Sequence, residues 1–168
     1  MQIAAQNPEA IAYAAVYPSP AGCLGIRLDA RGRLCGLDCL PEATAAVPAA
    51  TAAAARVLAV LDAYFTDPAA IPAGLELAPS GTPFQRRVWR ALQAIPSGTV
   101  RTYGTLAAEL GSAPRAVGQA CRHNPIPVLV PCHRVVARAG IGGYAGATAG
   151  PRLAMKQWLL AHEGYPGA

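Results

Sequence analysis

Cys132 and His133 stand side by side in the segment Pro131-Cys132-His133-Arg134-Val135, directly after an apolar stretch bounded by prolines. A cysteine attacks as the thiolate, so its pKa of about 8.5 has to be lowered by a nearby base, cation or helix N-terminus. His133 is the neighbouring base, although neighbours in sequence need not touch in space. The segment therefore indicates a nucleophilic thiol at Cys132, with a buried, inert cysteine as the alternative.

A histidine that takes a proton from a thiol is usually oriented by a carboxylate, as in catalytic triads. The C-terminal half contains only two carboxylates, Glu109 and Glu163. Glu109 belongs to a predicted helix-turn-helix surface, so we predict that Glu163 holds the imidazole of His133. The other histidines, His123 and His162, we interpret as surface or capping residues.

The net charge of +5 is distributed unevenly along the 168 residues. Residues 1–80 hold four arginines against seven acids, a balance of −3, whereas residues 81–168 hold nine arginines and one lysine against two acids, a balance of +8. A basic half of this kind favours a polyanionic partner, with a solvated basic surface as the alternative.

The five cysteines favour reduced thiols over a disulfide framework, because the N-terminus lacks the basic and apolar segments of a secretory signal. Cys35 and Cys39 lack the further ligands that a zinc site needs, so we expect them to pack as small apolar groups on a strand. The longest alanine tract contains Pro48, which excludes a membrane span there. We expect a cytoplasmic monomer with no metal, no cofactor and no membrane association.

Turn residues divide residues 11–40 into short apolar stretches, which predicts a small antiparallel meander. The run from Pro48 to Phe65 places apolar side chains at helical spacing, so we expect a helix packed on that sheet. The stretch Ile71–Ser80 is rich in proline, glycine and alanine, allows a short strand at 75–77, and coincides with the change in charge. We place the domain boundary there, after residue 78.

Thr82 and Pro83 mark the start of a helix, because threonine can cap it, proline suits its first position, and a glutamine three residues after the cap completes a capping box. We predict a helix from Pro83 to about Ala94. Two shorter helices, Tyr103–Leu110 and about 112–122, follow with a glycine turn between them. This is the spacing of a helix-turn-helix.

The second of these shorter helices has one basic face. Arg115, Gly118, Gln119 and Arg122 lie at i, i+3, i+4 and i+7 on that face, and the opposite face is apolar. A glycine inside a helix costs about 1 kcal/mol relative to alanine, so Gly118 suggests the close approach of a ligand, a backbone or a crossing helix. Together with the charge distribution, this face predicts contact with DNA.

Several further motifs accompany the Cys132 segment: Gly81-Thr82-Pro83-Phe84-Gln85, Val88-Trp89, Tyr103, Arg115-Ala116-Val117-Gly118, Asn124-Pro125, Gly143-Tyr144-Ala145-Gly146 and Trp158-Leu159-Leu160-Ala161-His162-Glu163-Gly164. In these motifs and their order the chain resembles the methylated-DNA–protein-cysteine methyltransferases, also called O6-alkylguanine-DNA alkyltransferases, whose signature is Pro-Cys-His-Arg-Val. The resemblance covers the whole C-terminal half. The N-terminal half resembles the family only loosely, in its strand and helix pattern.

The resemblance implies a role for four residues in the chemistry. Cys132 would accept the alkyl group, and His133 would take the thiol proton through a water molecule. Glu163 would hold the imidazole, and Asn124 would support the turn and form hydrogen bonds near the site. Arg134, within the signature, we interpret as structural.

The resemblance also implies a binding site for a guanine that has left the duplex, which costs a few kcal/mol of unstacking. Arg115 would fill the vacated space in the stack, and Tyr103 would help to rotate the phosphate and would stack near the base. The base pocket would be lined by Pro127, Val135, Tyr144, Ala145 and Gly146. The helix face that approaches the minor groove would comprise Arg115, Ala116, Gly118, Gln119 and Arg122.

The sequence departs from the family pattern at two places. Some relatives carry a hydroxyl where Ala145 stands, so backbone N–H groups would have to serve the alkylated oxygen here. The linker 147–157 is a few residues longer than usual, which affects the expected shape of the pocket.

We therefore predict an α+β protein with two domains. Residues 1–78 would form a small antiparallel sheet with a packed helix, ribonuclease H-like by resemblance, and residues 79–168 a winged-helix-like helical domain. The predicted activity is single-turnover transfer of an alkyl group from O6-alkylguanine in double-stranded DNA to Cys132, with O4-alkylthymine left open as a second substrate.

Two other functions remain to be weighed. One is a DNA-damage recognition module like the alkyltransferase-like proteins, which lack the acceptor cysteine. The other is a thiol hydrolase with the same Cys-His-Glu set. Cys132 counts against the first, and the basic helix-turn-helix with Arg115 counts against the second.

Overall fold

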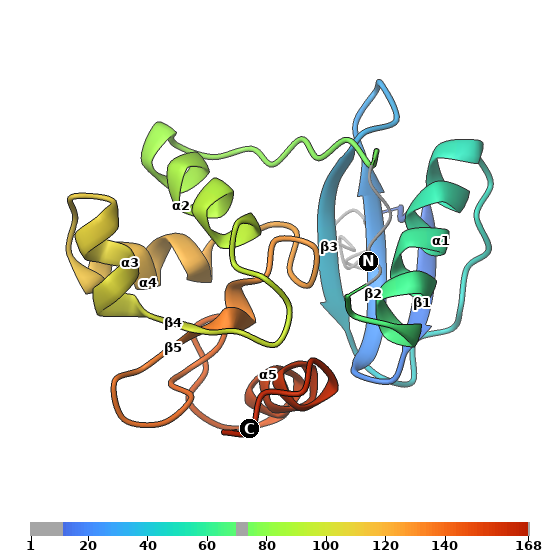
Figure 1. The fold of residues 1–168 in the computed structure, drawn as a ribbon. Helices are drawn as coiled ribbons and strands as arrows, with labels where there is room; N and C mark the ends of the chain where they lie inside the picture. Colours follow the sequence, from blue (N-terminus) through green and yellow to red (C-terminus); the bar gives the residue numbers. More distant parts are fainter. Residues whose placement is uncertain (1–11, 70–73, 168) are drawn as a thin grey trace, which may run out of the picture.

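The computed structural model describes residues 12–69 and 74–167, and Figure 1 shows its ribbon. The expectations about the extreme N-terminus and residues 71–73 lie outside this part of the chain. The elements follow in the order β1 (Ala15–Ser19), β2 (Gly22–Leu28), β3 (Leu34–Leu40), α1 (Ala52–Thr66), α2 (Pro83–Gln93), β4 (Arg101–Thr102), α3 (Tyr103–Glu109), α4 (Pro114–Arg122), the 3-10 turn η1 (Cys132–Arg134), β5 (Val135–Val136) and α5 (Pro151–His162).

The N-terminal half is a three-stranded antiparallel sheet in the order β1-β2-β3, with α1 beside it (Figure 1). Leu24, Ile26 and Leu34 from the strands are fully buried and belong to one apolar cluster with Val57 and Leu61 of α1. The predicted meander and its packed helix are confirmed.

Helix α1 begins at Ala52 rather than at the predicted Pro48. The side chain of Thr51 accepts a hydrogen bond from a backbone N–H of the first turn, which satisfies one of the free donors there and sets the start of the helix. Val57 and Tyr64, at i and i+7, lie on its buried face. A tyrosine with no exposed surface therefore lies on the apolar side of this helix.

Strand β3 lies at the edge of the sheet. Its outer side forms backbone hydrogen bonds with segments that follow α1 in the sequence. Leu34 pairs with Leu77 in a parallel bridge, which is all that forms of the strand expected at 75–77. The backbone N–H of Leu37 donates to the carbonyl of Pro125 at 2.8 Å, just upstream of the signature segment. The N-terminal half thus contacts the loop that leads to Cys132.

Helix α2 has the predicted bounds because its cap forms as expected. Thr82 and Gln85 exchange both hydrogen bonds of a capping box. On the buried side, the indole N–H of Trp89 donates to the carbonyl of Ala120 at 2.9 Å, which fixes α2 against α4. The short strands β4 and β5 pair in parallel, and this pairing, which the sequence did not predict, brings the start of α3 next to the signature segment.

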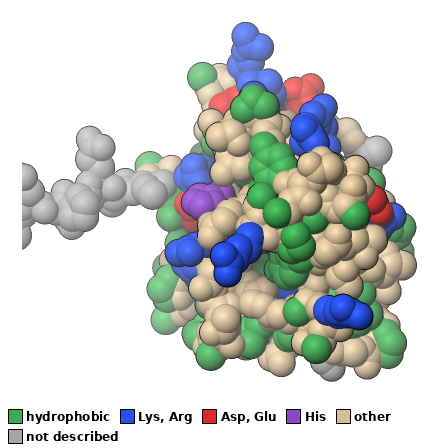
Figure 2. All heavy atoms as spheres, turned by 90° about the vertical axis from the view of Figure 1, so that its left-hand side faces the viewer, with side chains coloured by type: hydrophobic (Ala, Val, Ile, Leu, Met, Phe, Trp, Pro, Cys, Tyr) green, Lys and Arg blue, Asp and Glu red, His purple; other side chains and the backbone are tan. Residues whose placement is uncertain are grey.

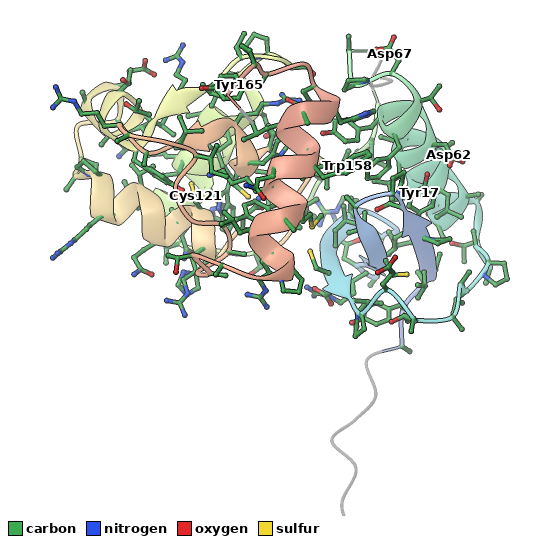
Figure 3. The ribbon with its side chains drawn as sticks, turned by 90° about the horizontal axis from the view of Figure 1, so that it is seen from below. Tyr17, Asp62, Asp67, Cys121, Trp158 and Tyr165 are labelled. Atoms are coloured by element: carbon green, nitrogen blue, oxygen red, sulfur yellow. The ribbon has the colours of Figure 1, made fainter. Side chains whose placement is uncertain are left out.

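Helix α5 lies between the two halves of the molecule (Figures 1 and 3). Trp158 on α5 packs against Phe65 of α1, which in turn stacks on Tyr17 of β1. Most of the expected 147–157 linker is therefore helical, because α5 begins at Pro151. Within the described residues, no helix has the length and apolar character needed to cross a membrane.

Candidate active site

The loop between α4 and η1 holds Cys132 in place through the side chain of Asn124. Its amide oxygen accepts a hydrogen bond from the N–H of Ile126 at 3.0 Å. Its amide nitrogen donates to the carbonyl of Val130 at 2.7 Å and to the sulfur of Cys132 at 3.2 Å. One side chain therefore closes the loop and contacts the thiol, the position that the resemblance implied for Asn124.

Backbone strain accompanies this loop. Val128 has a φ of 73°, a left-handed conformation that is unusual for a β-branched residue and costs on the order of 1–3 kcal/mol. A hydrogen bond of 2.9 Å from the N–H of Val130 to the carbonyl of Ile126 closes the turn around it. Its side chain is almost fully buried, so packing and hydrogen bonds together maintain the strained turn immediately before Cys132.

Cys132 is the first residue of η1 and is 5% exposed. Burial raises the pKa of its thiol, while the Asn124 amide, the Tyr144 hydroxyl and the Lys156 ammonium act in the opposite direction. The Tyr144 hydroxyl approaches the sulfur without reaching hydrogen-bond geometry and has no other partner in the described part of the chain. The resting thiol therefore holds its proton, and reaction requires a base.

The candidate base is His133, whose Nε2 lies 2.7 Å from Oε1 of Glu163. Both side chains are buried in the interior. Burial lowers the pKa of His133, and the neighbouring carboxylate only partly offsets this effect. Because the carboxylate accepts, Nε2 carries the proton of the neutral ring. Nδ1 is buried without a protein partner among the described residues and keeps its lone pair for an incoming proton.

Glu163 accepts hydrogen bonds from five donors. Oε1 accepts from His133, from the guanidinium of Arg134 at 2.9 Å and from the hydroxyl of Tyr64 at 2.7 Å. Oε2 accepts from the Nε of Arg134 at 2.8 Å and from the N–H of Gly98 at 3.3 Å. Burial by itself would raise the pKa of Glu163, but the hydrogen bonds from His133 and Arg134 outweigh it and hold the pKa well below its ordinary value. Glu163 is therefore a fixed negative charge.

Cys132 opens on a pocket of about 230 Å³ between α4 and the loop before α5. Of the residues expected to line the base pocket, Tyr144, Ala145 and Gly146 do so, as does Tyr103. Pro127 and Val135 do not line it: Pro127 is buried within the strained loop, and Val135 is buried in β5. The full lining is Tyr103, Gly118, Gln119, Cys121, Arg122, Cys132, Gly143, Tyr144, Ala145, Gly146, Ala147 and Thr148.

A larger groove, of about 710 Å³, lies between the sheet and α5. It holds Cys23 and Cys39 but not Cys132, and Ala147 lines both hollows. Cys39 approaches the sulfur of Met155 at 3.6 Å. Because Cys132, the thiol next to the buried His133 and Glu163, lines only the smaller pocket, that pocket is the candidate site for chemistry.

Lys156, for which no role was predicted, supports the pocket loop through Gly143. Its side chain has no exposed surface, and its ammonium donates to the carbonyls of Val135 at 2.7 Å and Gly143 at 3.1 Å. Burial lowers the pKa of Lys156 to about 8. The lysine therefore connects the pocket loop to β5, the strand that continues directly from η1.

Helices α3 and α4 form the helix-turn-helix that the sequence predicted. Arg115, Gln119 and Arg122 are exposed, with Ala116 and Gly118 partly exposed on the same helix. Figure 2 shows this side of the molecule, where Lys and Arg side chains are spread over the surface and acidic ones lie near its edges. The surface has the charge that a DNA phosphate backbone requires.

Gly118 faces the start of the crossing helix α3. Within the described residues, a methyl group added there would meet only the ring of Tyr103, at 4.0 Å. Of the alternatives weighed from the sequence, close approach of a ligand and contact with the crossing helix both remain. Since Gly118, Gln119 and Arg122 line the pocket as well as the helix face, the basic face of α4 and the mouth of the pocket are continuous.

Comparisons with known proteins agree with this geometry. Residues 83–165 match the family model described as 6-O-methylguanine DNA methyltransferase, DNA binding domain. Over 105 residues the chain is 54% identical to the methylated-DNA–protein-cysteine methyltransferase of Salmonella typhimurium. The matched region covers 61% of this chain and 58% of that protein. A Cricetulus griseus protein of the same name is 46% identical over 116 residues, covering 63% of this chain and 53% of its own length.

Solved structures extend the likeness over nearly the whole chain. A variant of the Mycobacterium tuberculosis O6-methylguanine methyltransferase superposes with a TM-score of 0.73 at 35% identity, covering 91% of this chain and 92% of that one. The M. tuberculosis protein in complex with DNA gives a TM-score of 0.70 at 34% identity, covering 88% and 90%. The chain belongs to the methylated-DNA–protein-cysteine methyltransferase family.

Three residues near the reaction centre were missed from the sequence: Tyr64, Cys121 and Lys156. Lys156 interrupts an otherwise apolar helix face, and a lysine in that setting indicates a buried amine with carbonyl partners. Tyr64 lies on the apolar stripe of α1, where its hydroxyl needs a partner. Cys121 was assigned to the apolar face of α4, and no pattern in the sequence indicates that it reaches the pocket.

Proposed function

We propose that this protein repairs DNA by transferring the alkyl group of O6-alkylguanine directly and irreversibly to Cys132. One observation carries the proposal: a buried thiol opens into a pocket bounded by a basic helix-turn-helix, beside a neutral histidine held by a charged carboxylate. Nucleophile, base and orienting group are all present within one site. The proposal requires no cofactor.

In the proposed reaction, the Cys132 thiol loses its proton to Nδ1 of His133 through a water molecule, and the sulfur attacks the alkyl carbon. The new S–C bond forms as the C–O6 bond breaks, and the electron pair of the broken C–O6 bond passes to the guanine. The proton returns through solvent to N1 of the guanine, so an ordinary base is restored. Glu163 stabilises the transient imidazolium, as a triad carboxylate does.

The base must leave the duplex to reach the thiol. We infer that Arg115, exposed in the first turn of α4, occupies the vacated position in the stack. Tyr103 and Tyr144 bound the pocket, and the loop at Ala145 and Gly146 turns through positive φ angles of 49° and 82°. Ala145 has no hydroxyl, so we assign recognition of the alkylated oxygen to backbone N–H groups of this loop.

The product explains why one protein molecule acts once. A thioether has no good leaving group, and it occupies the position of the nucleophile. We propose that the protein acts as a monomer. The proposed partner is double-stranded DNA that contains O6-alkylguanine; a recognition module without transfer would not need the thiol, base and carboxylate together.

The test counts the methyl groups that each protein molecule accepts from the DNA. A duplex with one radiolabelled O6-methylguanine, supplied in tenfold excess over the protein, is expected to transfer one methyl group per protein molecule and then stop. Continued turnover would indicate the hydrolase alternative. Binding of the duplex without transfer would indicate a recognition module.

A further inference from the structure

Tyr64 brings the N-terminal half of the molecule into contact with the reaction centre. It comes from α1, nearly one hundred residues before Glu163, and its hydroxyl donates to Oε1 of that carboxylate at 2.7 Å. Its side chain has no exposed surface. A buried hydrogen bond between a neutral hydroxyl and a carboxylate is among the stronger kinds in proteins.

The acceptor atom makes this contact specific. Oε1 of Glu163 is the same oxygen that faces Nε2 of His133, also at 2.7 Å. The hydroxyl of Tyr64 and the imidazole therefore share one oxygen and compete for its charge. Burial and the neighbouring carboxylate raise the pKa of Tyr64 far above its ordinary value, so the hydroxyl remains a donor throughout the working pH range.

We propose that Tyr64 is a positioning residue for alkyl transfer, acting from the N-terminal half through Glu163 to fix the carboxylate and set the basicity of His133. The inference rests on the proposed function and extends it to a residue outside the helix-turn-helix half. Tyr64 does not line the pocket, and within the described residues its hydroxyl forms a hydrogen bond only with Glu163, so the carboxylate is its link to the site.

The direction of the effect follows from charge sharing. A donor to Oε1 withdraws part of the negative charge that would otherwise stabilise the imidazolium. Loss of the hydroxyl therefore raises the pKa of His133. Other titratable and charged groups face this pair from every side and stay in place: Arg134 and Cys132 from η1, Lys156 from α5, and His162, whose Nε2 lies 2.9 Å from the carbonyl of Tyr64.

The chain offers a matched pair of variants. Tyr64→Phe removes one hydroxyl and keeps the ring, which packs against Phe65 and His162. Tyr17→Phe also removes one hydroxyl near the contact between α1 and the sheet, where it donates to Asp62 at 2.7 Å outside the Glu163 network. Figure 3 shows Tyr17 and Asp62 on the sheet and α1, apart from Cys121 in the other half.

The experiment uses the full chain and two measurements. The pKa of His133 is read from its imidazole resonances by NMR, and the rate of methyl transfer is followed in single turnovers across pH. In Tyr64→Phe we expect the pKa of His133 to rise by about half a unit or more, the acid limb of the rate profile to move by the same amount, and the rate on that limb to fall about threefold. Tyr17→Phe should match the wild type in both measurements.

An unchanged pKa of His133 in Tyr64→Phe would overturn the inference, as would a loss of rate that merely follows loss of folded protein without a shift of the acid limb. The two proposals fail separately. If the wild type transfers no methyl group while the pKa of His133 still rises in Tyr64→Phe, the proposed function is refuted, but the control of His133 basicity by Tyr64 through Glu163 stands.

Discussion

The network around Glu163 and the outer face of α4 use polar side chains in opposite ways. In the network, His133, Arg134 and Tyr64 are buried, and each donates to a single carboxylate. On α4, Arg115 and Gln119 are exposed and make no side-chain hydrogen bond within the described residues. The polar groups of the Glu163 network are hydrogen-bonded within the protein, whereas those on the outer face of α4 are exposed to a partner.

This difference separates chemistry from recognition. Changes in the network should affect every substrate and should also affect folding, because a buried charge would lose its partners. Changes on α4 should affect only substrates that come as duplex DNA and should leave stability almost unchanged. Each prediction below tests one side of that separation.

Glu163→Gln should have the largest effect. It removes the negative charge that five donors surround, which leaves the guanidinium of Arg134 buried without a counter-charge and should cost about 3 kcal/mol of stability. It also weakens the base, so the transfer rate should fall about a hundredfold on any substrate. Thermal unfolding and single-turnover rates measure the two losses. Glu109→Gln, the same substitution at an exposed acid paired with Arg101, is the control and should change neither.

Arg115→Ala should act on duplex DNA alone. Without the side chain that fills the stack, the flipped state loses roughly 2 kcal/mol, or about thirtyfold in the rate on duplex DNA. Reaction with the free base O6-methylguanine should be unchanged. The comparison is a ratio of two rates, with Arg86→Ala, an exposed arginine on α2, as the control. Equal losses of rate on both substrates would show that Arg115 does not fill the vacated position in the stack.

Lower pH should slow the transfer once the ring of His133 gains a proton, by up to about tenfold per pH unit below its pKa. Burial holds the pKa of His133 below about 6.5, so the ring is neutral at pH 7 and gains its proton only on the acid side. Because the pKa of His133 is lower in the folded protein than in the unfolded chain, the unfolded chain binds its proton at a higher pH than the folded protein does. The free energy of unfolding therefore also falls as pH drops below about 6.5. Rates and melting temperatures measured at matched ionic strength check both effects; a rate that rose toward pH 5 would exclude His133 as the base.

Gly118→Ala should have the smallest effect: it should raise the stability and lower the rate on duplex DNA. Alanine stabilises a helix interior by about 1 kcal/mol relative to glycine, and the added methyl group meets nothing closer than 4.0 Å within the described residues. The melting temperature should therefore rise. The methyl group narrows the approach of DNA to α4, so the rate on duplex DNA should fall by about two- to fivefold, while the free base reacts as before. A stabilised variant with full duplex activity would show that the glycine serves neither ligand nor DNA.

Local chemistry made much of this fold predictable. The capping box at Thr82 and Gln85 involves residues three apart, so its pattern in the sequence fixes the start of α2 directly. The partner of His133 could be named because only two carboxylates occur in its half, and Glu163 lies where that reasoning placed it.

Contacts between distant segments set the limit of prediction. Pro127 and Val135 were assigned to the pocket, but which side of a short strand faces a cavity depends on packing that the motif does not encode. Tyr64 was missed because its partner lies across the contact between the two halves. The boundary after residue 78 remains a prediction, since one apolar cluster includes residues from both sides of it.

The most direct test of the account is to locate the transferred group. After reaction with a duplex that contains O6-methylguanine, the intact protein should gain one methyl group, and peptide mass spectrometry should place it on Cys132. Cys121 lines the same pocket, so Cys121→Ser is the matched control and should still be methylated at Cys132. Methylation that persists in Cys132→Ser, or that maps to Cys121, would contradict the assignment of Cys132 as the acceptor.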